Sequence, residues 1–124
     1  MFVAIISFCT LDAWRSLPDV IPLPFESAAW KRADPIERHR TVRSQMVDDL
    51  LKKRLLYGMT RAEIKELLGL SEPNLDQSGV DASRWHMAYF LGMERAGAFS
   101  LDDEFLVIRF DKDGRAIEVR TIVN

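Results

Sequence analysis

The chain has 124 residues, of which 48% are hydrophobic, and a formal net charge of −2. This length predicts one domain with a substantial core. The weakly acidic balance excludes the basic footprint of a nucleic-acid-binding domain. A single cysteine excludes a disulfide framework or a cysteine-based zinc site, and two isolated histidines, His39 and His86, do not make a metal site. We therefore expect no nucleic-acid partner, no metal and no cofactor.

The N-terminal stretch MFVAIISFC is almost wholly apolar. It is too short to span a bilayer, and it resembles the end of a signal-peptide core that lacks the usual basic start. Cys9 suggests lipidation, as in bacterial lipoproteins, although Phe8 stands where such signals carry a small residue. Three interpretations stay open: a lipidated anchor at Cys9, an atypical export or anchor segment, and a buried N-terminal strand.

A proline-rich spacer follows, with prolines at positions 18, 22 and 24. This density favours extended chain and opposes a helix. Residues 1–24 are therefore expected to form an export- or anchor-like segment with a spacer, ahead of a domain at 25–124. The stretch FESAAW opens that domain, and we expect it to be an arm whose Trp30 packs onto the rest.

The first long helix is predicted to start at Asp34-Pro35, which suit the N-cap and the first helical position. Val42, Met46 and Leu50 then recur every four residues and form a one-sided apolar stripe. This pattern is typical of an amphipathic helix packed on a core.

A tight joint is predicted between this helix and the next. Gly58 is expected to end the first helix, and Thr60 is the N-cap of the second, with Glu63 completing a capping box. Met59 is expected to pack against the second helix as a hydrophobic staple, and Gly69 closes that helix in a left-handed conformation. The sequence thus gives each of these residues a structural role.

The C-terminal part predicts a three-stranded sheet. Leu70 is expected to fold back onto Ile64, and a polar, turn-rich stretch then leads to segments of alternating apolar residues. The expected order is a strand at 85–91, a loop at 92–103, a strand at 104–110, a tight turn closed by Gly114 and a strand at 115–123.

The first strand carries large apolar side chains on both faces, so one set must lie away from the helices. Either Phe25 and Trp30 fold back over that set, or a partner covers it. Aromatic residues, methionine and arginine are enriched at interfaces. The candidate partner-binding residues are Trp85, Tyr89, Met93, Arg95 and Phe99.

No sequence motif in the chain indicates a particular enzymatic reaction. There is no phosphate-binding glycine loop and no G-x-S-x-G elbow. The acidic run at 102–104 is expected to be solvated, and Asp111 and Asp113 lack the later ligands of a calcium loop. His86 is expected to partner a neighbouring polar group. We therefore expect a protein that is not an enzyme.

Three stretches occur in a recognisable order, namely GMTRAEIKELLG, WHMAYFLG and LVIRFDKDGRAIEVR. Together they resemble the SmpA/OmlA family, the BamE-like domains, over residues 47–123. The resemblance implies an α+β fold in which two N-terminal helices pack on a three-stranded antiparallel sheet. This arrangement is also similar to the halves of β-lactamase inhibitor proteins.

The resemblance also implies a function. The family includes BamE, an outer-membrane lipoprotein that assists β-barrel assembly by binding protein partners and lipid. A non-enzymatic binding module of the bacterial cell envelope is therefore expected, periplasmic or membrane-anchored, with a protein partner and with membrane association through its N-terminus. The alternative is an inhibitor- or immunity-type protein that blocks an enzyme with its sheet and loops.

Overall fold

The computed structural model describes residues 22–33, 42–93 and 102–123. The elements in chain order are α2 (Ser27–Arg32), α3 (Val42–Lys52), α4 (Arg61–Leu68), β1 (Met87–Met93), β2 (Asp103–Phe110) and β3 (Ala116–Val123). The strands form one antiparallel sheet in the order β1-β2-β3. The predicted α+β class, with helices before a three-stranded antiparallel sheet, is confirmed at this level. The predictions for Cys9, Pro18, His39, the Asp34-Pro35 helix start, Arg95 and Phe99 lie outside the described residues.

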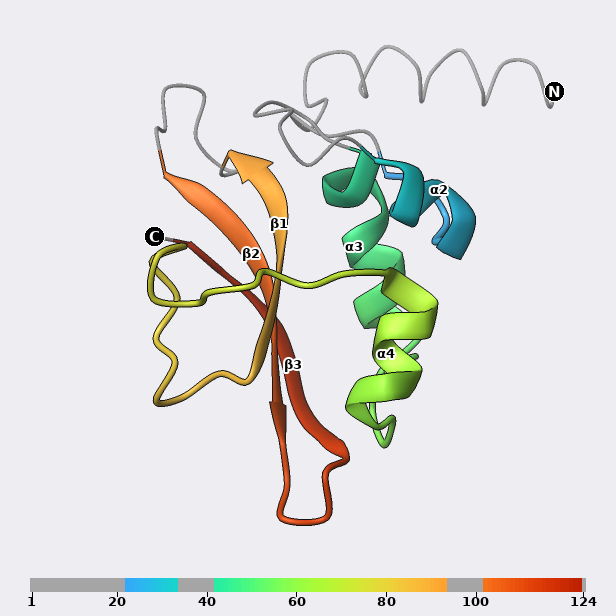
Figure 1. The fold of residues 1–124 in the computed structure, drawn as a ribbon. Helices are drawn as coiled ribbons and strands as arrows, with labels where there is room; N and C mark the ends of the chain where they lie inside the picture. The colour runs from blue at the N-terminus through green and yellow to red at the C-terminus, as the bar shows by residue number, and fades with distance from the viewer. Residues whose placement is uncertain (1–21, 34–41, 94–101, 124) are drawn as a thin grey trace, which may run out of the picture.

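The helices cover one face of the sheet, and the segment 70–85 passes from the end of α4 to the opposite face (Figure 1). The main core fills the space between the helices and the sheet. Its side chains come from every helix and every strand and from the turn after α3: Trp30, Met46, Val47, Leu50, Leu56, Ile64, Leu68, Met87, Tyr89, Leu91, Leu106, Ile108, Ala116 and Val119.

Helix α2 holds Trp30 in this core, where its side chain is 0% exposed. The indole contacts Phe25 on one side and Tyr89 on the other, with ring centroids 5.9 and 6.3 Å away. The prediction that Trp30 packs on the domain is confirmed, but the short helix was not predicted. The Leu23 N–H also donates to the Gln45 carbonyl of α3 at 2.8 Å, so residues before position 25 contact the domain as well.

Helix α3 ends at Lys52, well before Gly58, so the prediction that Gly58 ends this helix is wrong. The chain leaves the helix through Arg54, which has a positive φ of 53°. The Arg54 guanidinium lies 4.0 Å from the centroid of the Tyr57 ring. Gly58, with a φ of 83°, belongs instead to the turn that carries the chain to β3.

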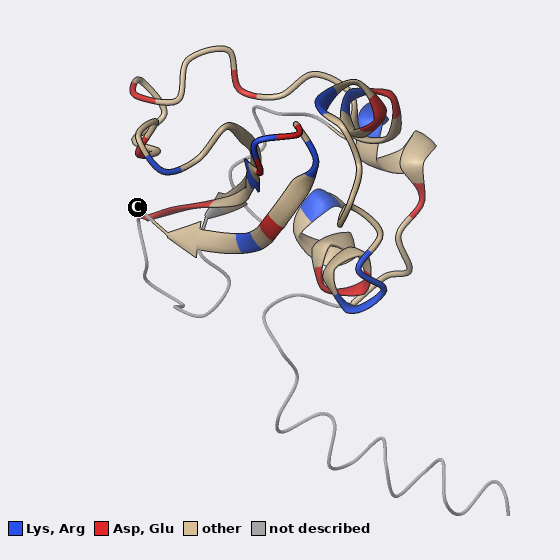
Figure 2. Ribbon diagram, turned by 90° about the horizontal axis from the view of Figure 1, so that it is seen from below, with Lys and Arg blue, Asp and Glu red and all other residues tan. Residues whose placement is uncertain are grey.

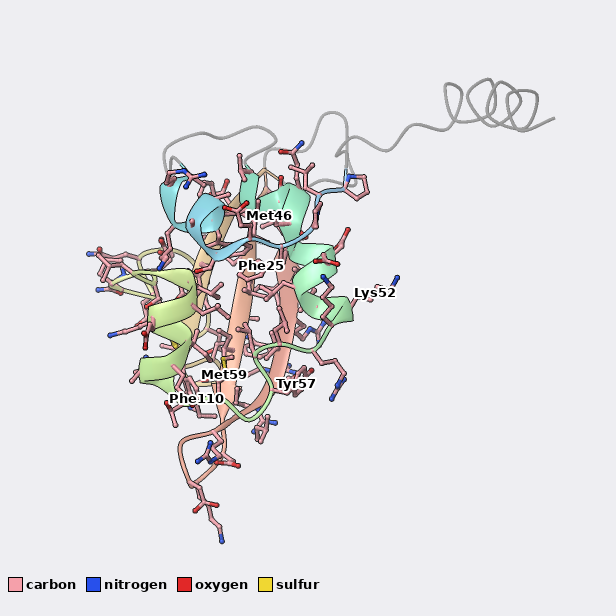
Figure 3. The ribbon with its side chains drawn as sticks, turned by 90° about the vertical axis from the view of Figure 1, so that its right-hand side faces the viewer. Phe25, Met46, Lys52, Tyr57, Met59 and Phe110 are labelled. Atoms are coloured by element: carbon pink, nitrogen blue, oxygen red, sulfur yellow. The ribbon has the colours of Figure 1, made fainter. Side chains whose placement is uncertain are left out.

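The joint at 58–60 lies along the outer edge of β3 and hydrogen-bonds to the start of that strand. The Gly58 N–H donates to the Ala116 carbonyl at 2.9 Å, and the Ala116 N–H donates to the Met59 carbonyl at 2.8 Å. Met59 and Phe110 lie together below the N-terminal start of α4 (Figure 3), and both pack against the main core. The joint therefore fastens α4 to the sheet at the same place where it starts the helix.

The predicted capping box on α4 is confirmed. The Glu63 N–H donates to the Thr60 hydroxyl at 3.3 Å, and the Thr60 N–H donates to Glu63 Oε1 at 2.9 Å. The backbone hydrogen bond from Thr60 holds the pKa of the Glu63 carboxyl below its usual value. Gly69 closes the helix with a φ of 82°, as expected, but Leu70 is 85% exposed and does not fold back onto Ile64.

We expect Thr60→Ala to lower the free energy of unfolding by about 1 kcal/mol, because it removes one side of the capping box. Equilibrium urea melts would measure the loss. Thr60→Ser is the matched control, since it keeps the capping hydroxyl and should retain most of the stability. Equal losses for both variants would contradict a capping role.

The strands differ from prediction mainly at their ends. β1 runs from Met87 to Met93, two residues later than expected at each end, and its pairing with β2 shifts between Phe90 and Gly92. The pairing of β2 with β3 shifts between Arg109 and Phe110. The tight turn before β3 contains Gly114 with a φ of 79°, as predicted.

Candidate functional site

The predicted partner surface does not form as expected. Tyr89 is 0% exposed and faces the helices, and its hydroxyl donates to the Gly69 carbonyl at 2.9 Å. Burial raises the pKa of Tyr89 to about 12. Tyr89 therefore contributes to the main core, and placing it on an outer face of the sheet is wrong.

Trp85 lies on the opposite side of the sheet from Tyr89 and is 4% exposed. It belongs to a second apolar cluster with Val80, Ala88, Phe105 and Val107, against which Leu75, Phe90 and Ile122 also pack. The segment 70–85 thus covers this face, so neither Phe25 and Trp30 nor an external partner is its main cover. Of the other candidates, Met93 ends β1, and Arg95 and Phe99 are outside the described residues.

A different surface feature stands out, a groove between α4 and the segment that follows it. The groove has a volume of about 610 Å³, within the range typical of ligand-binding sites. Its walls and floor combine basic, apolar and polar residues: Arg61, Lys65, Leu70, Ser71, Glu72, Pro73, Leu75 and His86.

Two backbone features hold the groove open. The positive φ of Gly69 turns the chain away from α4, and a side chain there would come within 3.2 Å of Lys31. The Glu72 N–H then donates to the Ala88 carbonyl on the outer edge of β1 at 2.8 Å. Fixing the segment to β1 keeps Leu70 between the helix and the strand with its side chain in solvent.

His86 lies at the β1 end of the groove in a fixed orientation. Its Nδ1 accepts from the Phe110 N–H at 2.9 Å, and its ring stacks on Phe110 with centroids 5.9 Å apart. This confirms the prediction that His86 partners a neighbouring polar group. Because Nδ1 accepts, a neutral imidazole here carries its proton on Nε2.

The basic side of the groove is formed by Arg61 and Lys65, which lie four residues apart on α4. Arg61 Nη2 donates to the His86 carbonyl at 3.2 Å, and its guanidinium lies 5.2 Å from the Phe110 ring centroid. Within the described ranges, neither Arg61 nor Lys65 forms an ion pair. The groove thus presents two cations beside an exposed leucine.

The sequence did not single out this groove. No role was predicted for Arg61 or Lys65, and the stretch after Gly69 was expected to be polar and turn-rich. The overlooked signal is Leu70, a large apolar residue directly after a helix-terminating glycine and directly before the polar Ser71. Only the path of the chain across β1 shows that Leu70 stays exposed beside the two cations.

No group of three or more His, Cys, Asp or Glu residues in the described ranges is placed to hold a metal ion. None of the helices in those ranges has both the length and the apolar character needed to cross a membrane. No protein-family model, curated protein or solved structure matches the chain.

Proposed function

We propose that the chain is a non-enzymatic binding module of the bacterial cell envelope, and that the groove beside α4 receives a segment of a protein partner. The observation that carries this proposal is the presence of Leu70, 85% exposed, in one groove with the cationic groups of Arg61 and Lys65, which form no ion pair within the described ranges. Apolar surface rimmed by polar residues is typical of interaction sites, and charges beside it orient the partner.

The chemistry of the groove selects the occupant. An apolar side chain of the partner would cover Leu70 and Pro73, while a neighbouring carboxylate would lie against Arg61 and Lys65. Glu72 also lines the groove, but its Oε1 accepts from the Ser78 hydroxyl at 2.8 Å and is already engaged. The partner segment is therefore acidic and carries at least one large apolar residue.

The BamE-like arrangement is part of the same proposal. Two observations support it: helices precede the strands, and the three strands are consecutive neighbours in the sheet. The short helix α2 and the covering of the second face by 70–85 are additions to the expected pattern.

A peptide-display experiment tests the groove. Peptides selected on the full chain should combine an acidic residue with a large apolar one. A selected peptide should bind Leu70→Ser roughly tenfold more weakly, because an apolar contact is lost. It should bind Lys65→Glu roughly fivefold more weakly, because attraction becomes repulsion.

Matched controls are available elsewhere on the surface. Leu55→Ser removes a partly exposed leucine outside the groove, and Lys112→Glu makes the same charge change in the turn before β3. Both should leave the affinity unchanged. Selected peptides that bind the Leu70 and Lys65 variants as tightly as wild type would refute the groove as the site.

The location has its own test. The chain expressed from its natural gene with a C-terminal tag should be recovered with periplasmic or membrane fractions. Recovery only with cytosolic markers would refute the envelope part of the proposal while leaving the groove measurements valid.

A further inference from the structure

The outer edge of β3 is a second feature of the molecule that does not depend on the groove. Alternate residues of an edge strand point their N–H and C=O groups away from the sheet. The contacts of β3 identify which residues these are. Ala116 bonds outward to the 58–59 turn ahead of the register shift opposite Arg109 and Phe110, where Ile117 is the extra residue. Beyond that shift, the Val119 carbonyl accepts from the Tyr57 hydroxyl at 3.4 Å. By alternation, Thr121 and Val123 also point outward.

The hydrogen bonding of β2 indicates the same outward-pointing residues of β3. The Ile108 carbonyl accepts from the His86 N–H on the β1 side, so Ile108 and its partner Val119 do not bond each other across the ladder. Thr121, two residues on, therefore also faces away from β2. Among the described residues, no hydrogen bond reaches the outward N–H and C=O groups of Thr121 and Val123.

Within the described ranges, the edge is thus covered at its start and open at its end. The 57–59 turn protects β3 as far as Val119, with Tyr57 on the β3 side of the molecule (Figure 3). Beyond it, Val123 is 43% exposed on the helix-facing side of the strand. A row of outward backbone groups beside an exposed apolar residue is suited to the addition of another strand.

Charge determines which strand would fit. Glu118 on β3 meets three arginines: Arg109 Nε at 3.0 Å, Arg84 Nη2 at 3.2 Å and Arg120 Nη1 at 3.9 Å. One carboxylate does not neutralise three guanidinium groups. Arg120 is the most loosely held, and its side chain is 56% exposed. The acidic and basic positions follow one another along β3 towards the C-terminus (Figure 2).

We propose that the open edge of β3 at 120–123 accepts an extended, acidic segment of a protein partner as an antiparallel fourth strand. In that pairing the residue opposite Arg120 occupies a non-hydrogen-bonded position, where side chains approach most closely. A Glu or Asp there would neutralise Arg120, and its alternate apolar neighbours would lie along Val123. A second copy of the chain fits less well, because its β3 edge brings the same surplus of arginines.

The test uses two short synthetic peptides, one alternating valine with glutamate and the other alternating valine with lysine. The full chain should prefer the glutamate peptide roughly fivefold. On binding, the amide protons of Thr121 and Val123 should become protected from exchange in NMR spectra. Arg120→Glu should reverse the preference, whereas Lys112→Glu, the same charge change in the turn, should leave it intact.

A second pair of variants tests the backbone contribution. Thr121→Pro removes the outward N–H without removing a bond to β2 and should abolish binding of both peptides, while Thr121→Val should bind as wild type does. Equal affinity for the two peptides, or an unchanged preference in Arg120→Glu, would overturn the proposal even if the proline variant failed to fold. Concentration-dependent dimerisation that Arg120→Glu leaves unchanged would also overturn it, by assigning the edge to a second copy.

Discussion

Replacing Trp30 with alanine should lower the free energy of unfolding by about 3–5 kcal/mol. The indole is fully buried and joins α2 to the rest of the core through Phe25 and Tyr89. The Arg43 guanidinium lies 5.5 Å from the Trp30 ring, and Arg43 Nε donates to the Trp30 carbonyl at 3.0 Å. Removing the ring leaves a cavity beside a cation whose burial already lowers its pKa.

Trp30→Phe distinguishes the contribution of the aromatic ring to stability from that of the indole N–H. The Trp30 Nε1 is buried and has no acceptor in the described part of the chain. Phenylalanine keeps most of the apolar contact and removes that unsatisfied donor, so it should cost about 1–2 kcal/mol. Urea melts of both variants would measure these changes in the free energy of unfolding. A decrease below about 1 kcal/mol for Trp30→Ala would contradict a structural role for α2.

The parts of the fold that the sequence predicted correctly are those specified by local chemistry. The capping box needs only Thr60 and Glu63 at the right spacing, and the β2–β3 turn needs only a residue able to adopt the positive φ of Gly114. Alternation also placed Met87, Tyr89 and Leu91 on one face of the first strand, as the main core confirms. These signals are short and independent of the rest of the chain.

The parts it missed depend on contacts between distant segments. FESAAW is too short to show helical periodicity, so the sequence did not predict α2. The helix depends on the burial of Trp30 in the main core. The stop at Lys52 arises from Arg54, which adopts a positive φ although nothing in its residue type demands it. A glycine such as Gly58 is a good indicator of positive φ but not of where a helix ends.

The candidate site was misplaced for a related reason. Strand alternation was extended to Trp85, but that residue lies before β1, and its N–H donates to the Asp81 carbonyl within a turn. The turn directs Trp85 to the face opposite Tyr89, so the two cannot form one surface. Sparse apolar residues in a polar stretch gave no warning that 70–85 would cover that face.

Trp85→Ala should test this second layer and lower the free energy of unfolding by about 3–5 kcal/mol. Trp85 fills the space between the 70–85 segment and the sheet, packed with Val80, Phe105 and Val107. Its ring also carries the Arg84 guanidinium at 4.8 Å, which positions Arg84 for its ion pair with Glu118. Losing the indole should therefore detach the segment from the sheet and weaken the charge cluster on β3.

Hydrogen exchange would distinguish local release from general destabilisation. The Val80 N–H, which donates to the Leu75 carbonyl at 2.8 Å, should exchange much faster in Trp85→Ala than core amides of β2 do. Leu70→Ala is the matched control, because it truncates an exposed residue of the same segment and should change stability by no more than about 0.5 kcal/mol. If Trp85→Ala were equally mild, the 70–85 segment would be a surface loop, and the far face of the sheet would be open to a partner after all.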